Sequence, residues 1–170
     1  MAILPIRVFG DPVLRQPTLE VEEIDGALVQ LAGDMLETMY AAPGVGLAAP
    51  QIGVQRRFFV YDVGDGPGAV VNPRIVETSG TWTYLEGCLS VPDLHWEIVR
   101  PARVHLVGLG LDGEDIDIEA DELLGRCFQH EVDHLGGMLL LERLATADRK
   151  DAMRILRERT LAAGARGSVP

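Results

Sequence analysis

Residues 121–135 read Asp121-Glu-Leu-Leu-Gly-Arg-Cys-Phe-Gln-His-Glu-Val-Asp-His-Leu135, and this stretch is the starting point for predicting the fold. Its apolar residues recur at helical spacing, Asp121 stands where a helix N-cap is expected, and Gly136-Gly137 follows as a stop. The pattern therefore predicts a helix over 122–135. The apolar side chains of this segment indicate that the helix belongs to the core: Leu123, Leu124, Phe128 and Leu135.

Two histidines of this predicted helix, His130 and His134, are four residues apart. At that spacing they lie one turn apart on the same face, so both imidazoles can reach one metal ion about 2 Å away. Glu131, between them, can address a water molecule at the metal. The alternative is a chance pair of histidines, one solvated and one packed. Burial of the helix favours the metal site, because an unpaired buried histidine would need another explanation.

A catalytic metal site of this kind needs a third protein ligand. Cys127 precedes His134 by seven residues, about 10 Å along a helix axis, so its short side chain can hardly share a metal with both histidines. We predict that it is a packed core thiol. His95 and His105 fall in or near predicted strands, where a histidine is usually exposed or half-buried.

The fourth candidate, Cys88, lies in the segment Leu85-Glu-Gly-Cys-Leu-Ser-Val-Pro92. The glycine before it and the proline after it predict a shaped loop. A thiolate held rigidly there could complete the ligand set from a different part of the chain. From spacing alone, a metal ligand and a packed thiol remain equal alternatives for Cys88.

The rest of the chain predicts helices and strands without regular alternation. A helix is expected over 26–42, after the candidate N-cap Asp25, and an amphipathic helix over 147–163 has Met153, Leu156 and Leu161 on its apolar side. Strands are expected over 57–63, 69–72, 75–78, 98–100, 103–109 and 115–118. We predict an α+β fold, one domain over 1–170, with antiparallel or mixed sheets packed around the helix 122–135.

Composition limits the classes of function. With 26 acidic and 15 basic residues the formal charge is −11, which disfavours nucleic acid as a general partner and predicts no sequence-specific binding to it. Two cysteines and no leader-like N-terminus indicate a reducing compartment, and we expect a cytoplasmic protein. No stretch approaches 18 uninterrupted apolar residues, so a membrane span is not expected.

The charge is unevenly distributed along the sequence. From Arg143 to the end, seven basic and three acidic residues give +4, so the first 142 residues carry −15. This asymmetry suggests that the predicted C-terminal helix meets an anionic partner. The alternative is that its arginines only solvate the outer face of a packed helix.

Three separated segments resemble the three motifs of the peptide deformylases, in the same order and at similar spacing. They are Gly44-Val-Gly-Leu-Ala-Ala-Pro-Gln51, Glu86-Gly-Cys-Leu-Ser90 and Gln129-His-Glu-Val-Asp-His134. The resemblance extends roughly over residues 5–144 and includes Arg100-Pro101 and Asp112-Gly113. It implies a metal-dependent hydrolase that removes the formyl group from the N-terminal methionine of newly synthesised proteins and releases formate.

The resemblance also implies roles for individual residues. Cys88, His130 and His134 correspond to the three metal ligands, and Glu131 to the general acid and base. Gln51 and the backbone N–H of Leu89 correspond to the groups that stabilise the oxyanion. The residues that correspond to the walls around the extended substrate peptide are Val45, Gly46, Glu86 and Gly87.

One divalent metal per chain is implied, Fe(II) natively, with Zn, Ni or Co able to take its place. The implied partners are N-formylmethionyl nascent peptides and, through the basic C-terminal helix, the ribosome. Departures from the family pattern are small. Glu122 and Gly125 stand where many members have glycine and alanine, and Arg126 corresponds to a position near the methionine pocket, which leaves side-chain preference open.

Two rival functions are weighed against this one. A zincin-type metallopeptidase with the extended motif would need a histidine at the position of Leu140, although a downstream glutamate ligand would remain available to it. A binding module that holds a chain terminus beside a structural metal would usually need four protein ligands. Only three are found, and a glutamate next to a ligand has no use in a structural site.

Overall fold

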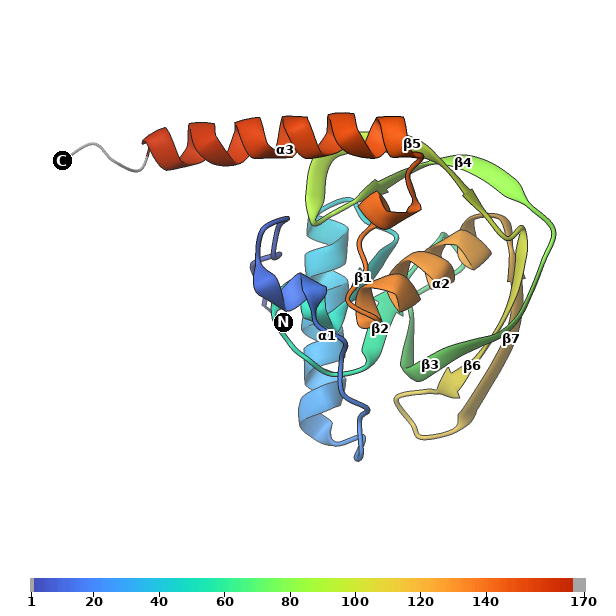
Figure 1. The fold of residues 1–170 in the computed structure, drawn as a ribbon. Helices are drawn as coiled ribbons and strands as arrows, with labels where there is room; N and C mark the ends of the chain where they lie inside the picture. Colours follow the sequence, from blue (N-terminus) through green and yellow to red (C-terminus); the bar gives the residue numbers. More distant parts are fainter. Residues whose placement is uncertain (1, 167–170) are drawn as a thin grey trace.

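Two antiparallel sheets lie on either side of the helix α2 (Figure 1). The computed structural model describes residues 2–166, with side chains described through residue 162. In chain order the elements are η1 (Pro12–Arg15), α1 (Gly26–Ala41), β1 (Gly46–Ala48), η2 (Ala49–Ile52), β2 (Phe58–Tyr61), β3 (Gly68–Ser79), β4 (Trp82–Cys88), β5 (Val91–Arg100), β6 (Arg103–Leu109), β7 (Asp115–Asp121), α2 (Glu122–Leu135), η3 (Leu140–Arg143) and α3 (Thr146–Arg166). The predicted α+β class is confirmed; residues 1 and 167–170 of the expected domain lie outside the described part.

The larger sheet has the strand order β1-β2-β3-β6-β7, and β4 and β5 form a separate hairpin. All five strand pairings in the described residues are antiparallel. The centre of the larger sheet is buried on both faces. Phe58 and Val60 of β2 pack with α1, whereas Phe59 between them packs with Phe128 of α2. Alternation of side chains along the strand thus joins both helices to one sheet.

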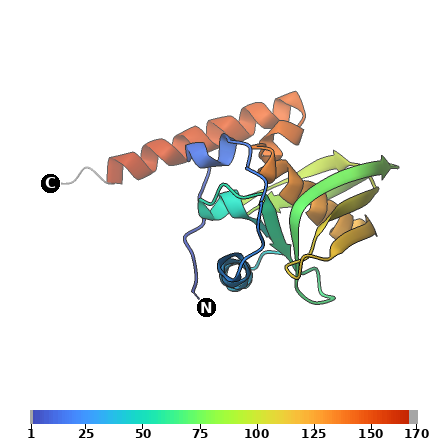
Figure 2. The same cartoon turned by 90° about the horizontal axis from the view of Figure 1, so that it is seen from below.

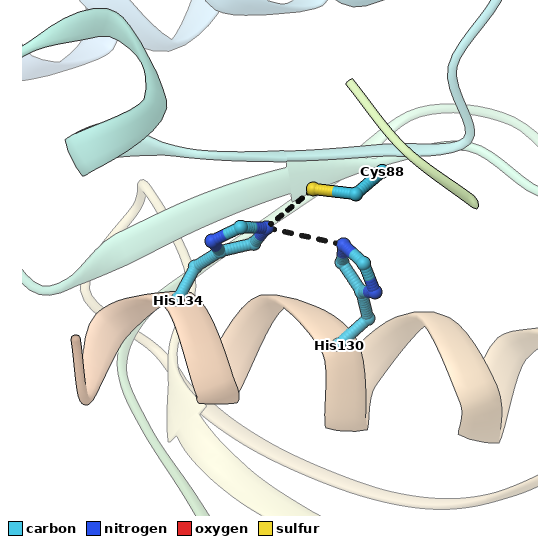
Figure 3. Close-up of side chains that lie close together, drawn as sticks. All are labelled: Cys88, His130 and His134. Carbon is cyan, nitrogen blue, oxygen red and sulfur yellow. Dashed lines mark hydrogen bonds between the residues drawn. The ribbon is translucent and has the colours of Figure 1, made fainter. Parts of the chain in front are cut away.

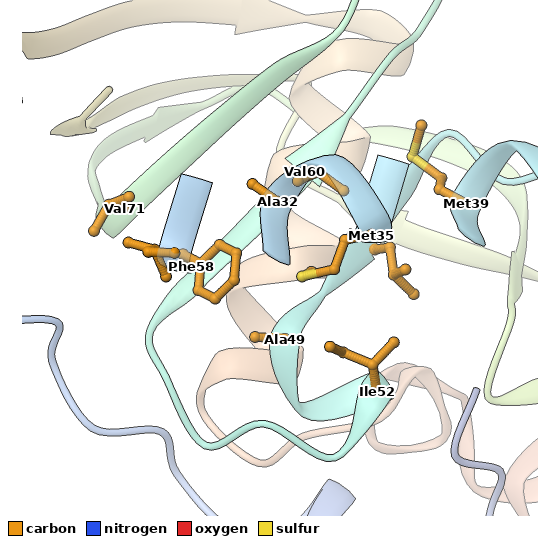
Figure 4. Close-up of a cluster of buried hydrophobic side chains, with 10 residues drawn as sticks. Ala32, Met35, Met39, Ala49, Ile52, Phe58, Val60 and Val71 are labelled. Atoms are coloured by element: carbon orange, nitrogen blue, oxygen red, sulfur yellow. The ribbon is translucent and has the colours of Figure 1, made fainter. Parts of the chain in front are cut away.

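Helix α1 begins as predicted, with the Asp25 carboxylate accepting a hydrogen bond of 2.8 Å from the N–H of Leu28. Its buried face forms the core cluster shown in Figure 4. Asp121 occupies the N-cap position of α2, as expected, but its side chain makes no capping hydrogen bond there.

The strand predictions were partly wrong. The expected strands 69–72 and 75–78 are one continuous strand, β3, whose pairing with β6 shifts register around Pro73. The hairpin β4–β5 was largely missed, since only 98–100 was expected to be extended. Its inward face carries the charged residues Glu86 and Arg100, each bound to a charged partner inside the protein. The usual alternation of apolar and polar residues is therefore absent from these strands.

The helix expected over 147–163 is α3, and it runs past the body of the molecule (Figure 2). Its base packs on the hairpin β4–β5 through Ala152 and Leu156, in a cluster that also contains Cys88. Leu161, expected on the apolar side, is 74% exposed because the helix has left the body by that point. No helix in residues 2–166 is long and apolar enough to cross a membrane.

Candidate active site

Three side chains from two distant segments converge between α2 and the hairpin β4–β5 (Figure 3). His130 and His134 lie one turn apart on α2, and their Nε2 atoms are 3.1 Å from each other. Cys88 is the last residue of β4, not a loop residue as expected, and its Sγ lies 3.2 Å from Nε2 of His134. The three ligand atoms lie within 4.8 Å of one another. The structure thus brings together the predicted ligand set.

The donor chemistry of this cluster fits a divalent metal. One thiolate and two imidazole nitrogens are typical ligands of zinc and ferrous iron, and three protein ligands leave a position open. The tautomer of His130 suits this role, because its Nδ1 lies 2.7 Å from Oε1 of Glu86 and Nε2 remains as the ligand atom. Cys88, His130 and His134 are therefore the residues that could hold a divalent metal.

The other three ligand candidates are not part of this cluster. Cys127 is buried and its thiol donates to the carbonyl oxygen of Val45 at 3.4 Å, and burial raises the pKa of this thiol well above its ordinary value. His95 lies against Gly87. His105 faces Asp117 on the neighbouring strand at 2.7 Å. Among the described residues, none of the three joins the cluster of Cys88 and the two histidines.

Glu131 lies beside the cluster and is almost completely buried. Burial raises the pKa of its carboxyl group to about 7, so it can exchange a proton near neutral pH. Its Oε1 packs against Gly46, where an added Cβ would collide with it. Its Oε2 has no hydrogen-bond partner in residues 2–166. Glycine at position 46 therefore makes room for a carboxylate with one uncommitted oxygen atom.

Gln51 is held from η2 with its amide pointing toward the cluster. Its Oε1 accepts a hydrogen bond of 2.8 Å from the N–H of Ala48, and its Nε2 lies 3.2 Å from Oγ of Ser90 and 3.9 Å from Sγ of Cys88. Leu89 follows Cys88 in the turn between β4 and β5 and is half-buried. Both residues are thus next to the cluster.

A single cavity of about 490 Å³ connects these groups. The cavity is lined by five of the predicted catalytic and ligand residues: Gln51, Cys88, Leu89, His130 and Glu131. The four positions predicted to contact substrate line it as well: Val45, Gly46, Glu86 and Gly87. This volume is of the size that holds small ligands or part of a peptide.

Glu86 differs from the prediction in how its carboxylate is used. The carboxylate is 6% exposed and accepts two hydrogen bonds from Arg100, of 2.7 and 2.9 Å, and one of 3.1 Å from Arg126. Burial alone would raise its pKa, but the contacts with His130 and Arg100 hold the pKa well below its ordinary value. The charge of Glu86 is thus used inside the protein, where its carboxylate holds the ring of His130 through Nδ1.

Sequence reasoning missed the second carboxylate of this network. Asp133 accepts a hydrogen bond of 2.7 Å from Arg100 and one of 3.0 Å from Arg143. Arg100 thus bridges a carboxylate on β4 and a carboxylate on α2. The only signal for it was that Arg100-Pro101 matched the family pattern; neither spacing nor composition predicted which acids it would contact.

Comparisons with known proteins agree on one family. The family model described as polypeptide deformylase matches residues 3–150. A peptide deformylase of Clostridium acetobutylicum is 49% identical over 148 residues, which cover 87% of this chain and 99% of that protein. One from Acidothermus cellulolyticus is 49% identical and covers 93% of this chain and 88% of that protein.

Solved structures agree with the sequence comparisons. The peptide deformylase of Thermotoga maritima superposes with a TM-score of 0.83 at 46% identity, over 85% of this chain and 99% of that one. The enzyme of Legionella pneumophila superposes with a TM-score of 0.89 at 38% identity, over 99% of this chain and all of that one. The similarity therefore covers the fold as well as the three motifs.

Proposed function

We propose a role for each residue of this site from one premise: the chain belongs to the peptide deformylase family. It is an enzyme, a metal-dependent hydrolase that removes the N-formyl group from the N-terminal methionine of newly synthesised proteins and releases formate. The observation that carries the assignment of roles is the convergence of Cys88, His130 and His134 next to the buried Glu131.

Cys88, His130 and His134 hold the metal. When bound, a divalent metal supplies Lewis-acid chemistry, lowering the pKa of water and polarising a carbonyl oxygen. Glu86 fixes the ring of His130 through Nδ1, and Arg100 and Arg126 keep Glu86 ionised in the protein interior.

Glu131 moves the proton. Its carboxyl group, with a pKa raised to about 7 by burial, takes a proton from the attacking water at Oε2 and passes it to the nitrogen of the leaving amine. The amine leaves as the free N-terminus of the deformylated peptide, which keeps all its residues, and formate carries the oxygen of the water. The packing of Oε1 against Gly46 holds the carboxylate in place during both transfers.

Gln51 and Leu89 stabilise the charge that develops on the formyl oxygen. The Nε2 of Gln51 and the backbone N–H of Leu89 are donors at the edge of the cavity beside Cys88. A donor that is in position before the reaction is typically worth about 3 kcal/mol of transition-state stabilisation. Val45 and Gly46 on one side and Glu86 and Gly87 on the other line the cavity as backbone walls for an extended peptide.

We assign Fe(II) as the native metal, with Zn, Ni and Co as substitutes. The thiolate of Cys88 beside two imidazoles suits each of these ions, and a ferrous ion next to a thiolate is sensitive to oxidation. Anaerobic purification followed by metal analysis tests this assignment. Iron at about one equivalent per chain is expected; zinc as the dominant metal under anaerobic conditions would contradict it.

An activity assay separates this function from its two rivals. Purified protein is given a formyl-methionyl peptide and its unformylated twin, and formate and new amino termini are measured. Formate release from the first peptide only, without internal cleavage, is expected. Internal cleavage of either peptide would indicate a metallopeptidase, and binding of the terminus without turnover would indicate a binding module.

The second part of the proposal is that α3 docks on the ribosome. Lys150, Arg154 and Arg157 follow each other at spacings of four and three, on the exposed face opposite Ala152 and Leu156. The side chains of Lys150 and Arg157 make no hydrogen bond or ion pair among the described residues, and Arg154 pairs within the helix, with Glu158 at 3.2 Å and Asp151 at 4.0 Å.

Two further basic side chains of α3, within residues 146–162, contact the body of the protein. Arg149 lies 3.6 Å from Glu142, and Arg159 donates a hydrogen bond of 2.7 Å to the carbonyl oxygen of Pro92. Lys150, Arg154 and Arg157 thus place positive charge on one outward stripe of an acidic protein, and none of the three pairs with its body. Ribosomal RNA at the peptide exit offers a phosphate surface for it, and the enzyme would meet its substrates there, in the cytoplasm.

The docking proposal is tested by changing Lys150, Arg154 and Arg157 together to glutamine. The matched control removes the same charge from three exposed arginines of the body: Arg56, Arg74 and Arg103. Co-sedimentation with ribosomes at low and moderate salt is measured, together with turnover of a short formyl peptide. The α3 variant should lose sedimentation and keep turnover, while the control keeps both. Equal sedimentation of the two variants would contradict docking.

A further inference from the structure

Ser90 is completely buried beside the cavity, and the chemistry assigned so far does not use it. Its Oγ lies 3.2 Å from Nε2 of Gln51, on the side chain to which oxyanion stabilisation is assigned. The other end of the same amide is held as well, because Oε1 of Gln51 accepts a hydrogen bond of 2.8 Å from the N–H of Ala48. Gln51 is therefore fixed at both ends.

These two contacts determine the direction of the remaining N–H. The N–H of Ala48 can only donate, so it fixes which end of the amide is the oxygen. The hydroxyl of Ser90 then accepts one of the two hydrogens on Nε2. The second hydrogen points toward Sγ of Cys88, 3.9 Å from Nε2, at the edge of the cavity. A planar amide held at both ends cannot turn away before the substrate arrives.

Ser90 itself is held by a segment far away in the sequence. Its carbonyl oxygen accepts a hydrogen bond of 2.8 Å from the N–H of Phe9, and it lies in the turn that joins β4 to β5. The turn also contains Leu89 and follows directly on Cys88. One turn thus carries a metal ligand, an oxyanion donor and the residue that holds the other donor.

We propose that Ser90 is a positioning residue, whose hydroxyl aims the Gln51 amide at the formyl oxygen; this inference rests on the role proposed for Gln51. Removal of the hydroxyl leaves the donor present but free to turn. The loss should therefore be smaller than the roughly 10²- to 10³-fold loss that follows removal of an oxyanion donor. We expect a decrease in kcat of about tenfold for Ser90→Ala, with KM changed less than about twofold.

The test is a double-mutant cycle in the metal-loaded enzyme. Ser90→Ala, Gln51→Ala and the double variant are compared for kcat, KM, metal content and thermal unfolding. If Ser90 acts through Gln51, the double variant has the kcat of Gln51→Ala alone, because residues in one network are not additive. Thr38→Val is the control: it removes another buried hydroxyl, which donates to Asp34, and should leave kcat unchanged.

A spectroscopic measurement gives a readout that does not depend on turnover. In ¹⁵N-labelled, zinc-loaded protein, the two side-chain amide hydrogens of Gln51 should resonate apart in the wild type and move toward each other in Ser90→Ala. Metal content should remain at one equivalent in both proteins, and Thr38→Val should leave these signals in place.

The outcomes distinguish this inference from the function on which it rests. If Gln51→Ala keeps full kcat, the proposed role of Gln51 is wrong and the positioning role falls with it. If Gln51→Ala loses activity but Ser90→Ala keeps both kcat and the wild-type amide signals, only the positioning role is overturned. Multiplicative losses in the double variant would also overturn it.

Discussion

Helices α2 and α3 follow each other in the chain but relate to the protein in opposite ways. Ten of the fourteen residues of α2 are buried, and the helix packs between the large sheet and the hairpin β4–β5. In residues 146–162 of α3, only Ala152 and Leu156 are buried, and most of the helix extends from the body. One helix is surrounded by protein and the other mostly by solvent.

This difference suits α2 to the reaction and α3 to contact with another molecule. Burial gives α2 a low-polarity surrounding, which is what raises the pKa of Glu131 and makes the contacts of Glu86 and Arg100 strong. Exposure gives α3 side chains that can face another molecule. The family match ends at residue 150, in the first turns of α3, so the shared part of the sequence holds the reaction site.

Removal of a ligand should have the largest effect. We expect Cys88→Ala to lose its bound metal and all measurable deformylation, because two histidines alone leave the site incomplete. Cys127→Ala is the matched control, since Cys127 is a second buried thiol that lies outside the cluster and donates to the carbonyl oxygen of Val45. Metal content by elemental analysis distinguishes the two variants, and full metal in the first with loss in the second would reverse the ligand assignment.

Glu131→Gln should keep the metal and lose about 10²- to 10⁴-fold in kcat, because an amide can neither take nor give the proton. The three ligands are untouched, so metal content should remain at one equivalent. Steady-state release of formate measures the effect. If the variant kept more than a tenth of wild-type kcat, Glu131 would not be the general acid and base.

Within α3, burial predicts which part of the helix stabilises the fold. Leu156 is 5% exposed and packs in the cluster that contains Cys88, so Leu156→Ala should lower the free energy of unfolding by about 2–4 kcal/mol. Leu161, at 74% exposure, should change it by less than about 0.5 kcal/mol when replaced by alanine. Urea unfolding of the zinc-loaded proteins measures both; equal values would mean that α3 does not pack as described.

The smallest effect concerns the start of α2. Glu122 has a φ of 45°, in the left-handed region that favours glycine because a side chain with a Cβ is strained there. Glu122→Gly should be more stable than Glu122→Ala by about 1 kcal/mol, since both lack the carboxylate and only glycine avoids the strain. Thermal unfolding under identical metal loading compares them, and a more stable alanine variant would contradict the explanation.

The sequence predicted helix α2 well and the hairpin β4–β5 poorly. Helix α2 was predicted with correct bounds because its apolar spacing, the histidine pair and Gly136-Gly137 all agree with one element. The hairpin β4–β5 was not, because Glu86 and Arg100 point inward and satisfy each other across the hairpin. Pairing of charges over a distance of fourteen residues leaves no local pattern from which a buried strand could be recognised.

Some residues of the site could be predicted from local spacing and others could not. The histidines and the intervening glutamate are one pentapeptide, so local spacing was enough to predict them. Axial distance already argued against Cys127, but Cys88 could be chosen as a ligand rather than a packed thiol only with the family resemblance, because its distance from α2 depends on how the hairpin folds back. Asp133 was missed although it lies inside the same pentapeptide, because its partners Arg100 and Arg143 come from β5 and η3.

The contact between Gly46 and Glu131 has a consequence for the genetics of this protein. Every missense change of a glycine codon adds at least a β-carbon, and at residue 46 that atom would occupy the place of the Glu131 carboxylate. The codon therefore has no conservative neighbour. We expect the smallest of these changes, Gly46→Ala, to encode a folded, metal-loaded polypeptide that fails to turn over, so that in a cell it behaves as a null allele while the protein still accumulates.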